Sequence, residues 1–154
     1  MDYRENRLNL VNLGEKRIYE LQSMYELYFA KLVQVGDDSA YLLGGQSVPQ
    51  LTKTAIIKRT VYHVKRDDQG DWQVERDSLM QRQRICFGAC KYNDSSIIVV
   101  GGKGYSENSM KDTEFWSGGE SKWQAGPPLN TGRRNPSVIV TDGTIIVVGG
   151  AEGD

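Results

Sequence analysis

The sequence contains a single histidine, His63, among its 154 residues. A zinc or copper site built from imidazole ligands needs two or three of them, so no metal site and no other cofactor is expected. The chain also lacks the Gly-x-Ser-x-Gly elbow, the His-Glu-x-x-His helix and the phosphate-binding loop that ends in Gly-Lys-Ser/Thr. No catalytic residue is therefore predicted.

Cysteine is almost as rare, with two residues spaced as Cys-x3-Cys, Cys86 and Cys90. On an expected strand, positions four apart share a face but lie about 13 Å from each other at roughly 3.3 Å per residue. A disulfide does not span that distance. We predict two reduced, buried thiols.

Long apolar runs and an excess of one charge are absent as well. The longest apolar run has four or five residues, far fewer than the roughly 20 that a membrane-spanning helix needs. Nineteen basic and twenty acidic residues nearly cancel, and the basic residues cluster only in pairs. Neither a membrane nor nucleic acid is expected as a partner. The polar amino terminus is unlike a secretion signal, so a cytoplasmic location is expected.

What the chain does contain is a repeated pattern of apolar residues followed by two glycines. The first glycines of the three pairs are separated by 57 and 48 residues. Repetition near a period of roughly 50 residues is typical of β-propeller blades. The three runs are Ala40–Gly45, Ile97–Gly102 and Ile145–Gly150.

Tryptophan and arginine recur with the same period. Trp72 and Trp123 are 51 residues apart, and each is followed ten residues later by an arginine, Arg82 or Arg133. Another tryptophan, Trp116, precedes Trp123 by seven residues. The order of glycine pair, tryptophan and arginine is therefore a true repeat.

The second repeat resembles the kelch motif closely. Phe115–Trp123, then Pro127-Pro128-Leu129 and Arg133, reproduce its aromatic residue, turn, tryptophan, proline-rich link and arginine. The resemblance implies an all-β fold made of kelch-type β-propeller blades, each a four-stranded antiparallel sheet. In the first repeat two arginines compete for the signature position, because counting from Trp72 favours Arg82 and counting back from Gly101 favours Arg84.

Strands are expected where apolar runs alternate with turn residues. Four adjacent apolar residues indicate a strand buried on both faces, as stacked blades require. The residues between Gly45 and Tyr62 predict an enlarged loop over 47–58. The expected strands are Tyr28–Val35, Ala40–Gly44, Arg59–Lys65 and Trp72–Glu75 in the first blade, and Ile85–Tyr92, Ile97–Val100, Thr113–Ser117 and Lys122–Ala125 in the second.

The domain organisation that follows is an incomplete propeller over residues 1–154. Outer strands of a half blade are predicted over 7–24, full blades over 25–78 and 82–127, and inner strands of another half blade over 133–154. These add up to three blades, one fewer than the usual minimum of four in a closed propeller. The chain is then a fragment of a longer kelch protein, or half of a six-bladed homodimeric ring, or a unit capped by a different partner.

The resemblance implies a non-catalytic module that binds a protein or an acidic peptide. In kelch adaptors, arginines and asparagines at the start of the inner strands line the channel mouth, where a guanidinium grips a carboxylate with two parallel hydrogen bonds. The alternative for an arginine is to tie neighbouring blades together through backbone carbonyls. The candidate partner-binding residues are Arg82, Arg84, Arg133, Arg134 and Asn135.

The resemblance also offers an enzymatic alternative, because some kelch-type propellers isomerise sialic acids with arginine, glutamate and histidine in the channel. His63 is instead expected in the third strand from the axis, and Glu107 or Glu152 would have to act as the base. The three tryptophans are expected to pack between blades rather than to stack on a ligand.

Overall fold

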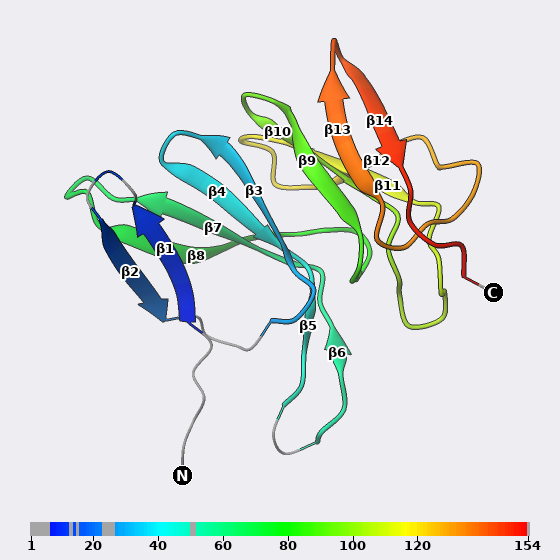
Figure 1. The fold of residues 1–154 in the computed structure, drawn as a ribbon, viewed down its shortest axis with the longest axis horizontal. Helices are drawn as coiled ribbons and strands as arrows, with labels where there is room; N and C mark the ends of the chain where they lie inside the picture. Colours follow the sequence, from blue (N-terminus) through cyan, green and yellow to red (C-terminus); the bar gives the residue numbers. More distant parts are fainter. Residues whose placement is uncertain (1–6, 13, 15, 23–26, 50–51, 154) are drawn as a thin grey trace.

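The computed structural model describes residues 7–12, 14, 16–22, 27–49 and 52–153, with side chains described outside 7–12 and 17–22. Strands and loops make up this part of the chain, and it contains no helix. Two four-stranded sheets and three two-stranded sheets account for all the strands (Figure 1).

The first four-stranded sheet forms one complete blade. Its order is β3-β4-β7-β8, and each neighbouring pair is antiparallel. The strands run over Lys31–Gly36 (β3), Ser39–Leu43 (β4), Thr60–Arg66 (β7) and Trp72–Leu79 (β8). We call this sheet blade one.

The second four-stranded sheet has the same design, with the strands in the order β9-β10-β11-β12. All three pairings are antiparallel. Its strands are Gly88–Asn93 (β9), Ser96–Val100 (β10), Thr113–Ser117 (β11) and Gln124–Ala125 (β12). We call this sheet blade two.

Two hairpins lie on either side of these blades. At one end β1 (Arg7–Asn12) pairs with β2 (Arg17–Gln22), and at the other β13 (Ser137–Thr141) pairs with β14 (Thr144–Val148). Strand β9 contacts β3 of blade one on one side and β13 on the other. The blades are thus stacked side by side and do not close into a ring (Figure 1).

The core lies between the two complete blades. Val33 and Val35 of blade one pack with Ile97, Val99 and Trp116 of blade two in one buried cluster. All five residues of β10 are buried, because blade one covers one face of the strand and β13 and β14 cover part of the other. The prediction of strands buried on both faces is confirmed for this run.

Glycine is required at the end of the apolar runs because the chain turns there against its neighbours. Gly44 and Gly102 have φ angles of 55° and 106°. A Cβ atom at Gly44 would lie 2.9 Å from the carbonyl oxygen of Arg84, and one at Gly102 would lie 2.8 Å from that of Ile85. Both the backbone conformation and the close approach exclude larger residues.

The observed strands differ from the expected ones in several places. The inner strands begin later than expected, at Lys31 and Gly88, because the residues before them form an isolated bridge and a bend. The expected loop over 47–58 contains a hairpin of β5 (Gln46–Ser47) and β6 (Ile56–Ile57). The four-stranded sheets cover 31–79 and 88–125, while the exact limits of each blade stay a prediction.

Candidate partner-binding edge

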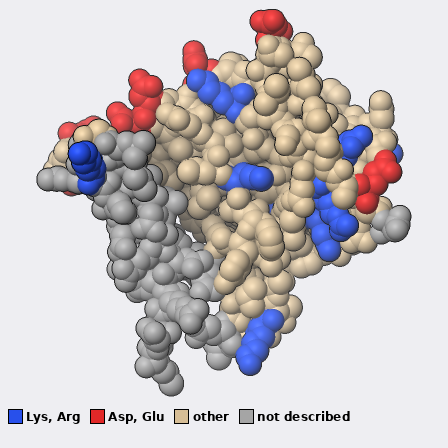
Figure 2. Space-filling view, in the orientation of Figure 1, with Lys and Arg blue, Asp and Glu red and all other residues tan. Residues whose placement is uncertain are grey.

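The molecule has two edges of different chemistry. Hairpin turns lie along the upper edge in Figure 1, which we call the turn edge, and the loops after the glycine pairs lie along the lower one. This loop edge comprises residues 44–49, 52–59, 80–87, 101–112, 126–136 and 149–153. The turns carry mainly aspartate, and Figure 2 shows acidic side chains mostly along the upper edge and basic ones below it.

An isolated β-bridge recurs at the loop edge in all three repeats. Tyr28 pairs with Gln46, Ile85 with Lys103, and Arg134 with Ala151. Each bridge joins the start of an inner strand to the residues after a glycine pair. The bridges thus mark equivalent positions, which we call the rim.

The residue that follows the first member of each bridge has a left-handed backbone. Phe29, Cys86 and Asn135 have φ angles of 59°, 54° and 54°. Such angles are uncommon outside glycine and are unfavourable for a bulky residue such as Phe29. Asn135 also donates its backbone N–H to the carbonyl of Cys86 at 2.6 Å, so this conformation links one repeat to the next.

Arg84 occupies the signature position and is fully buried. Its guanidinium donates to the carbonyl oxygens of Gly101 at 2.7 Å and Asp112 at 3.2 Å, and to Glu114 Oε1 at 2.6 Å. Burial lowers the pKa of Arg84, and the buried Glu114 carboxylate opposes that effect.

The expectation that Arg84 meets a partner is therefore wrong, because its side chain is 0% exposed and bonds within its own blade. Its guanidinium bonds backbone carbonyls, as the alternative expected, but those of its own blade rather than those of a neighbouring one. This assignment also settles the choice between Arg82 and Arg84 for the signature position.

Arg82 lies at the surface in an ion-pair network. It donates to Asp112 Oδ2 at 2.8 Å and to Glu107 Oε2 at 2.6 Å. The hydrogen bond to Glu107 is the largest effect that raises the pKa of Arg82. Both carboxylates belong to the loop 101–112, so Arg82 holds this loop, and an acidic ligand would have to compete with them.

The three remaining candidates are adjacent and lie at the rim. Arg133 is half-buried and donates to the carbonyl of Gly149 at 3.0 Å. Arg134 is half-buried, and its side chain has no hydrogen bond or ion pair with the described residues. Asn135 is exposed. Arg134 and Asn135 therefore present polar groups at the loop edge.

The sequence did not indicate three other rim residues. Tyr28 and Phe29 are 44% and 58% exposed, and Lys103 is half-buried with no ion pair in the described part of the chain. Their places at the rim become visible once Arg84 is taken as the signature arginine, because Lys103 then bridges Ile85 as Ala151 bridges Arg134. The sequence left Arg82 and Arg84 as alternatives, so these equivalent positions could not be counted from it.

The residues required by the enzymatic alternative have other contacts. His63 lies in β7, where Nε2 is 2.8 Å from the Ser39 hydroxyl and the ring stacks on Tyr41. Glu107 pairs with Arg82. No contact joins His63 to Glu107, and no group of metal-binding side chains occurs among the described residues.

The tryptophans and cysteines differ in their surroundings. Trp116 and Trp123 are buried, as expected for packing between blades, whereas Trp72 is half-buried under the Arg66 guanidinium. Both cysteines are free, as predicted, but they are half-buried rather than buried. Burial still raises the pKa of the Cys90 thiol. No helix of the described chain has the length and apolarity to cross a membrane.

The stacked four-stranded sheets define a β-propeller that does not close within the described residues, and arginines bond the glycine turns of its second and third repeats. No family model matches the chain. A stretch of 64 residues is 33% identical to Kelch-like protein 8 of Mus musculus and covers 42% of this chain and 10% of that protein. The fold is similar to the solved structure of YjhT, with a TM-score of 0.74 and 17% identity over 95% of this chain and 45% of YjhT.

These two similarities support a kelch-repeat family for the chain, and its four-stranded sheets match those of a kelch-type β-propeller. It spans about a tenth of the length of Kelch-like protein 8 and less than half that of YjhT. The likeness to YjhT concerns the fold alone.

Proposed function

We propose that the chain is a non-catalytic protein-interaction module that binds an acidic peptide segment at its loop edge. The contact residues are Arg134 and Asn135 of the third repeat and Lys103 of the second. The observation that carries the proposal is that Lys103 and Arg134 belong to two of the three bridges of the rim and have no carboxylate partner among the described residues.

The distribution of the other charged side chains also supports an acidic ligand at the loop edge. Arg66 and Lys91 on the turn side of the blades pair with Asp38 and Asp94, so their charge is already compensated. The loop edge adds Lys58 and further basic side chains without an ion pair in the described chain, namely Arg59 and Lys111. A ligand with carboxylates is thus attracted to the loop edge and repelled by the aspartates of the turn edge.

The similarity to Kelch-like protein 8 is consistent with protein binding as the general role. Two of the five predicted partner-binding residues are not part of the proposed site, because Arg84 is buried and Arg82 pairs with carboxylates of the loop 101–112. Arg133 contributes mainly by fixing the turn at Gly149. The location we propose is the cytoplasm, where short acidic segments of other proteins are accessible.

The test is binding of a fluorescent glutamate-rich peptide, measured by anisotropy. A double variant, Lys103→Glu with Arg134→Glu, should weaken binding at least about tenfold, since two charge-assisted contacts become repulsive. Added salt should weaken binding of the unmodified chain, because exposed charges are screened.

The matched control is Lys122→Glu, which makes the same charge change at an exposed position beside the β11–β12 turn. It should leave peptide affinity within about twofold of the original, since a difference below about 0.4 kcal/mol is expected for a remote site. Equal affinity of all variants would refute the rim assignment. An increased rate of anomeric exchange of a sialic acid by NMR would refute the non-catalytic role.

A further inference from the structure

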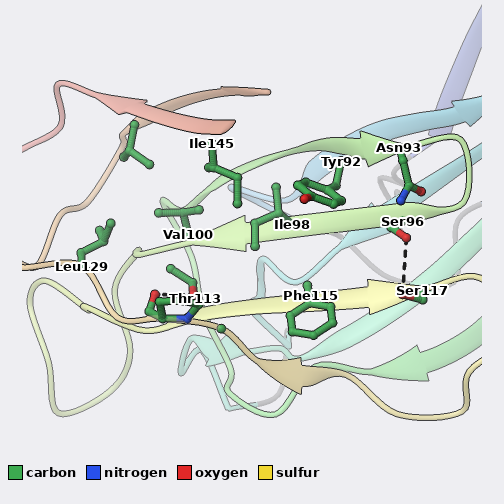
Figure 3. Close-up of a pocket in the computed structure, with 13 residues that line it drawn as sticks. Tyr92, Asn93, Ser96, Ile98, Val100, Thr113, Phe115, Ser117, Leu129 and Ile145 are labelled. Carbon is green, nitrogen blue, oxygen red and sulfur yellow. Dashed lines mark hydrogen bonds between the residues drawn. The ribbon is translucent and has the colours of Figure 1, made fainter. Parts of the chain in front are cut away.

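An apolar cavity of about 470 Å³ lies between blade two and the hairpin β13–β14. Ile98 and Val100 of β10 face Ile145 of β14 across it, and Phe115 of β11 lies beside them (Figure 3). Val147 of β14 also lines the cavity. In blade two the strand β10 is followed by β11 on its outer side, but β14 has no such neighbour among the described strands. The cavity thus lies where the third strand of another blade belongs.

Strand β14 is an open apolar edge. Ile145 and Ile146 are each 38% exposed, and Val148 is 61% exposed. The edge of β14 that faces away from β13 presents N–H and C=O groups together with apolar side chains, which favours pairing with another strand. A contact is therefore missing from this edge.

The two ends of the stack also have open apolar faces. Ile139 is 57% exposed on the side of the hairpin opposite to Val138, which approaches Gly88 of blade two. On blade one, Leu32 is 53% exposed and alternates with the buried Val33. Blade one and blade two already pack together through faces of this kind. The open face with Ile139 and the open face with Leu32 therefore correspond to the two sides of one more such interface.

The hairpin β1–β2 provides what β14 lacks. It pairs Val11 with Ile18, contacts β8 of blade one, and is not hydrogen-bonded to any other sheet. We match its apolar pair Val11 and Ile18 to Trp116 and Trp123, which lie opposite each other when the β11–β12 register is extended by one residue. The hairpin therefore corresponds to the two outer strands of a blade, and β13–β14 to the two inner ones.

We propose that β14 binds the β1–β2 hairpin of a second copy of this chain. A reciprocal contact completes one blade on each side of a twofold axis, as closed symmetric dimers require. Each chain then contributes two complete blades and two half blades. Two chains together form a closed ring of four complete blades and two shared ones.

The register of this contact follows from blade two. There Ile98 pairs with Phe115 and Val99 with Glu114. The equivalent pairs are Ile146 with the partner copy's Leu10, and Val147 with its Asn9. Val147 lines the cavity, so a strand that pairs with β14 in this register lies along the cavity.

The first experiment measures the native mass of the full 154-residue chain by light scattering across a dilution series. The expected mass is twice the 17.3 kDa of one chain. The variant Ile146→Lys with Val148→Lys should lose the dimer and have the mass of one chain. Ile56→Lys is the matched control, because Ile56 is equally exposed at 38% but lies on β6, and it should remain dimeric.

The second experiment tests the register with single-cysteine chains, in which the native Cys86 and Cys90 are first replaced by serine. A chain with Asn9→Cys, mixed with a chain carrying Val147→Cys, should form a disulfide-linked pair under mild oxidation. A mixture with Ile145→Cys instead should form several-fold less, since that position is two residues out of register. Circular dichroism identifies any variant that does not fold. If the lysine variant does not fold, the cross-link still tests the contact, because it changes only one residue of β1 or β14 in each chain.

The outcomes are distinct. A chain that remains monomeric throughout the series, or a dimer unaffected by the two lysines, would overturn the proposal. A dimer without the register-specific cross-link would also overturn it, because another surface would then form the contact. Additional strands supplied by a longer protein would appear as a monomer with this chain alone.

Discussion

The run Ile-Ile-Val-Val-Gly-Gly occurs twice in the chain, once in β10 and once in β14. In β10, Ile97 and Ile98 are 0% and 4% exposed, whereas the equivalent Ile145 and Ile146 are each 38% exposed. Both runs form the same strand and the same left-handed glycine turn. The difference shows that local sequence determines the strand, while its burial depends on neighbours that only blade two possesses.

The signature arginines show the same difference. Arg84 and Arg133 each donate to the carbonyl of the first glycine in their own repeat. Only Arg84 also finds a carboxylate, Glu114 of β11, because the hairpin β13–β14 has no third strand in the described chain. The signature arginine is thus half-buried in the two-stranded hairpin, and in the complete blade it forms a buried ion pair.

The largest effect is expected from breaking that ion pair. Arg84→Ala leaves the buried Glu114 carboxylate with only the backbone N–H groups of Gln81 and Arg82 as donors. Losing its cationic partner should lower the free energy of unfolding by about 3 to 5 kcal/mol. Arg133→Ala removes one hydrogen bond to a carbonyl and should cost about 1 kcal/mol or less. Denaturant titration of both variants measures the difference, and similar losses would show that the two repeats are equally complete.

A smaller effect is expected from truncating the repeated run itself. Ile97→Ala creates a cavity in the core and should cost at least about 2 kcal/mol. Ile145→Ala should cost less in the monomer, because the side chain is already partly in contact with water. Thermal unfolding at several concentrations checks this, and a concentration-independent loss at Ile145 as large as that at Ile97 would contradict the comparison.

The smallest effect concerns pH and blade one. Burial lowers the pKa of His63, Lys65 lowers it further, and Asp77 and Glu75 oppose the shift. The unfolded chain therefore takes up the proton first, and stability should decline as the pH falls below the ordinary value of 6.5. The decline should be smaller than the two losses above, and His63→Gln should remove it in acid-unfolding curves.

The sequence predicted the fold well because the glycine pairs and apolar runs are local signals. Strand β11 has the expected limits, Thr113–Ser117, and β10 begins one residue before the expected Ile97. The sequence could not decide whether Arg82 or Arg84 holds the signature position, since the carboxylate of Glu114 that binds Arg84 lies 30 residues away. Contacts between strands of this kind depend on register, which no local pattern contains.

The candidate site was only partly predictable for a related reason. Arg134 and Asn135 were predicted from the resemblance to kelch adaptors, but Phe29 and Lys103 join them at the rim through the repeated bridges and backbone conformation. The β5–β6 hairpin was missed because each of its strands has only two residues. Such short pairings depend on their surroundings rather than on propensity.

Hydrogen exchange of β14 compared with β10 tests the central claim most directly. If a second copy covers β14, its amides that point away from β13 should be protected at high concentration almost as well as those of β10. The protection should disappear on dilution and in the variant Ile146→Lys with Val148→Lys. Rapid exchange of these amides at every concentration, with β10 fully protected, would contradict the account.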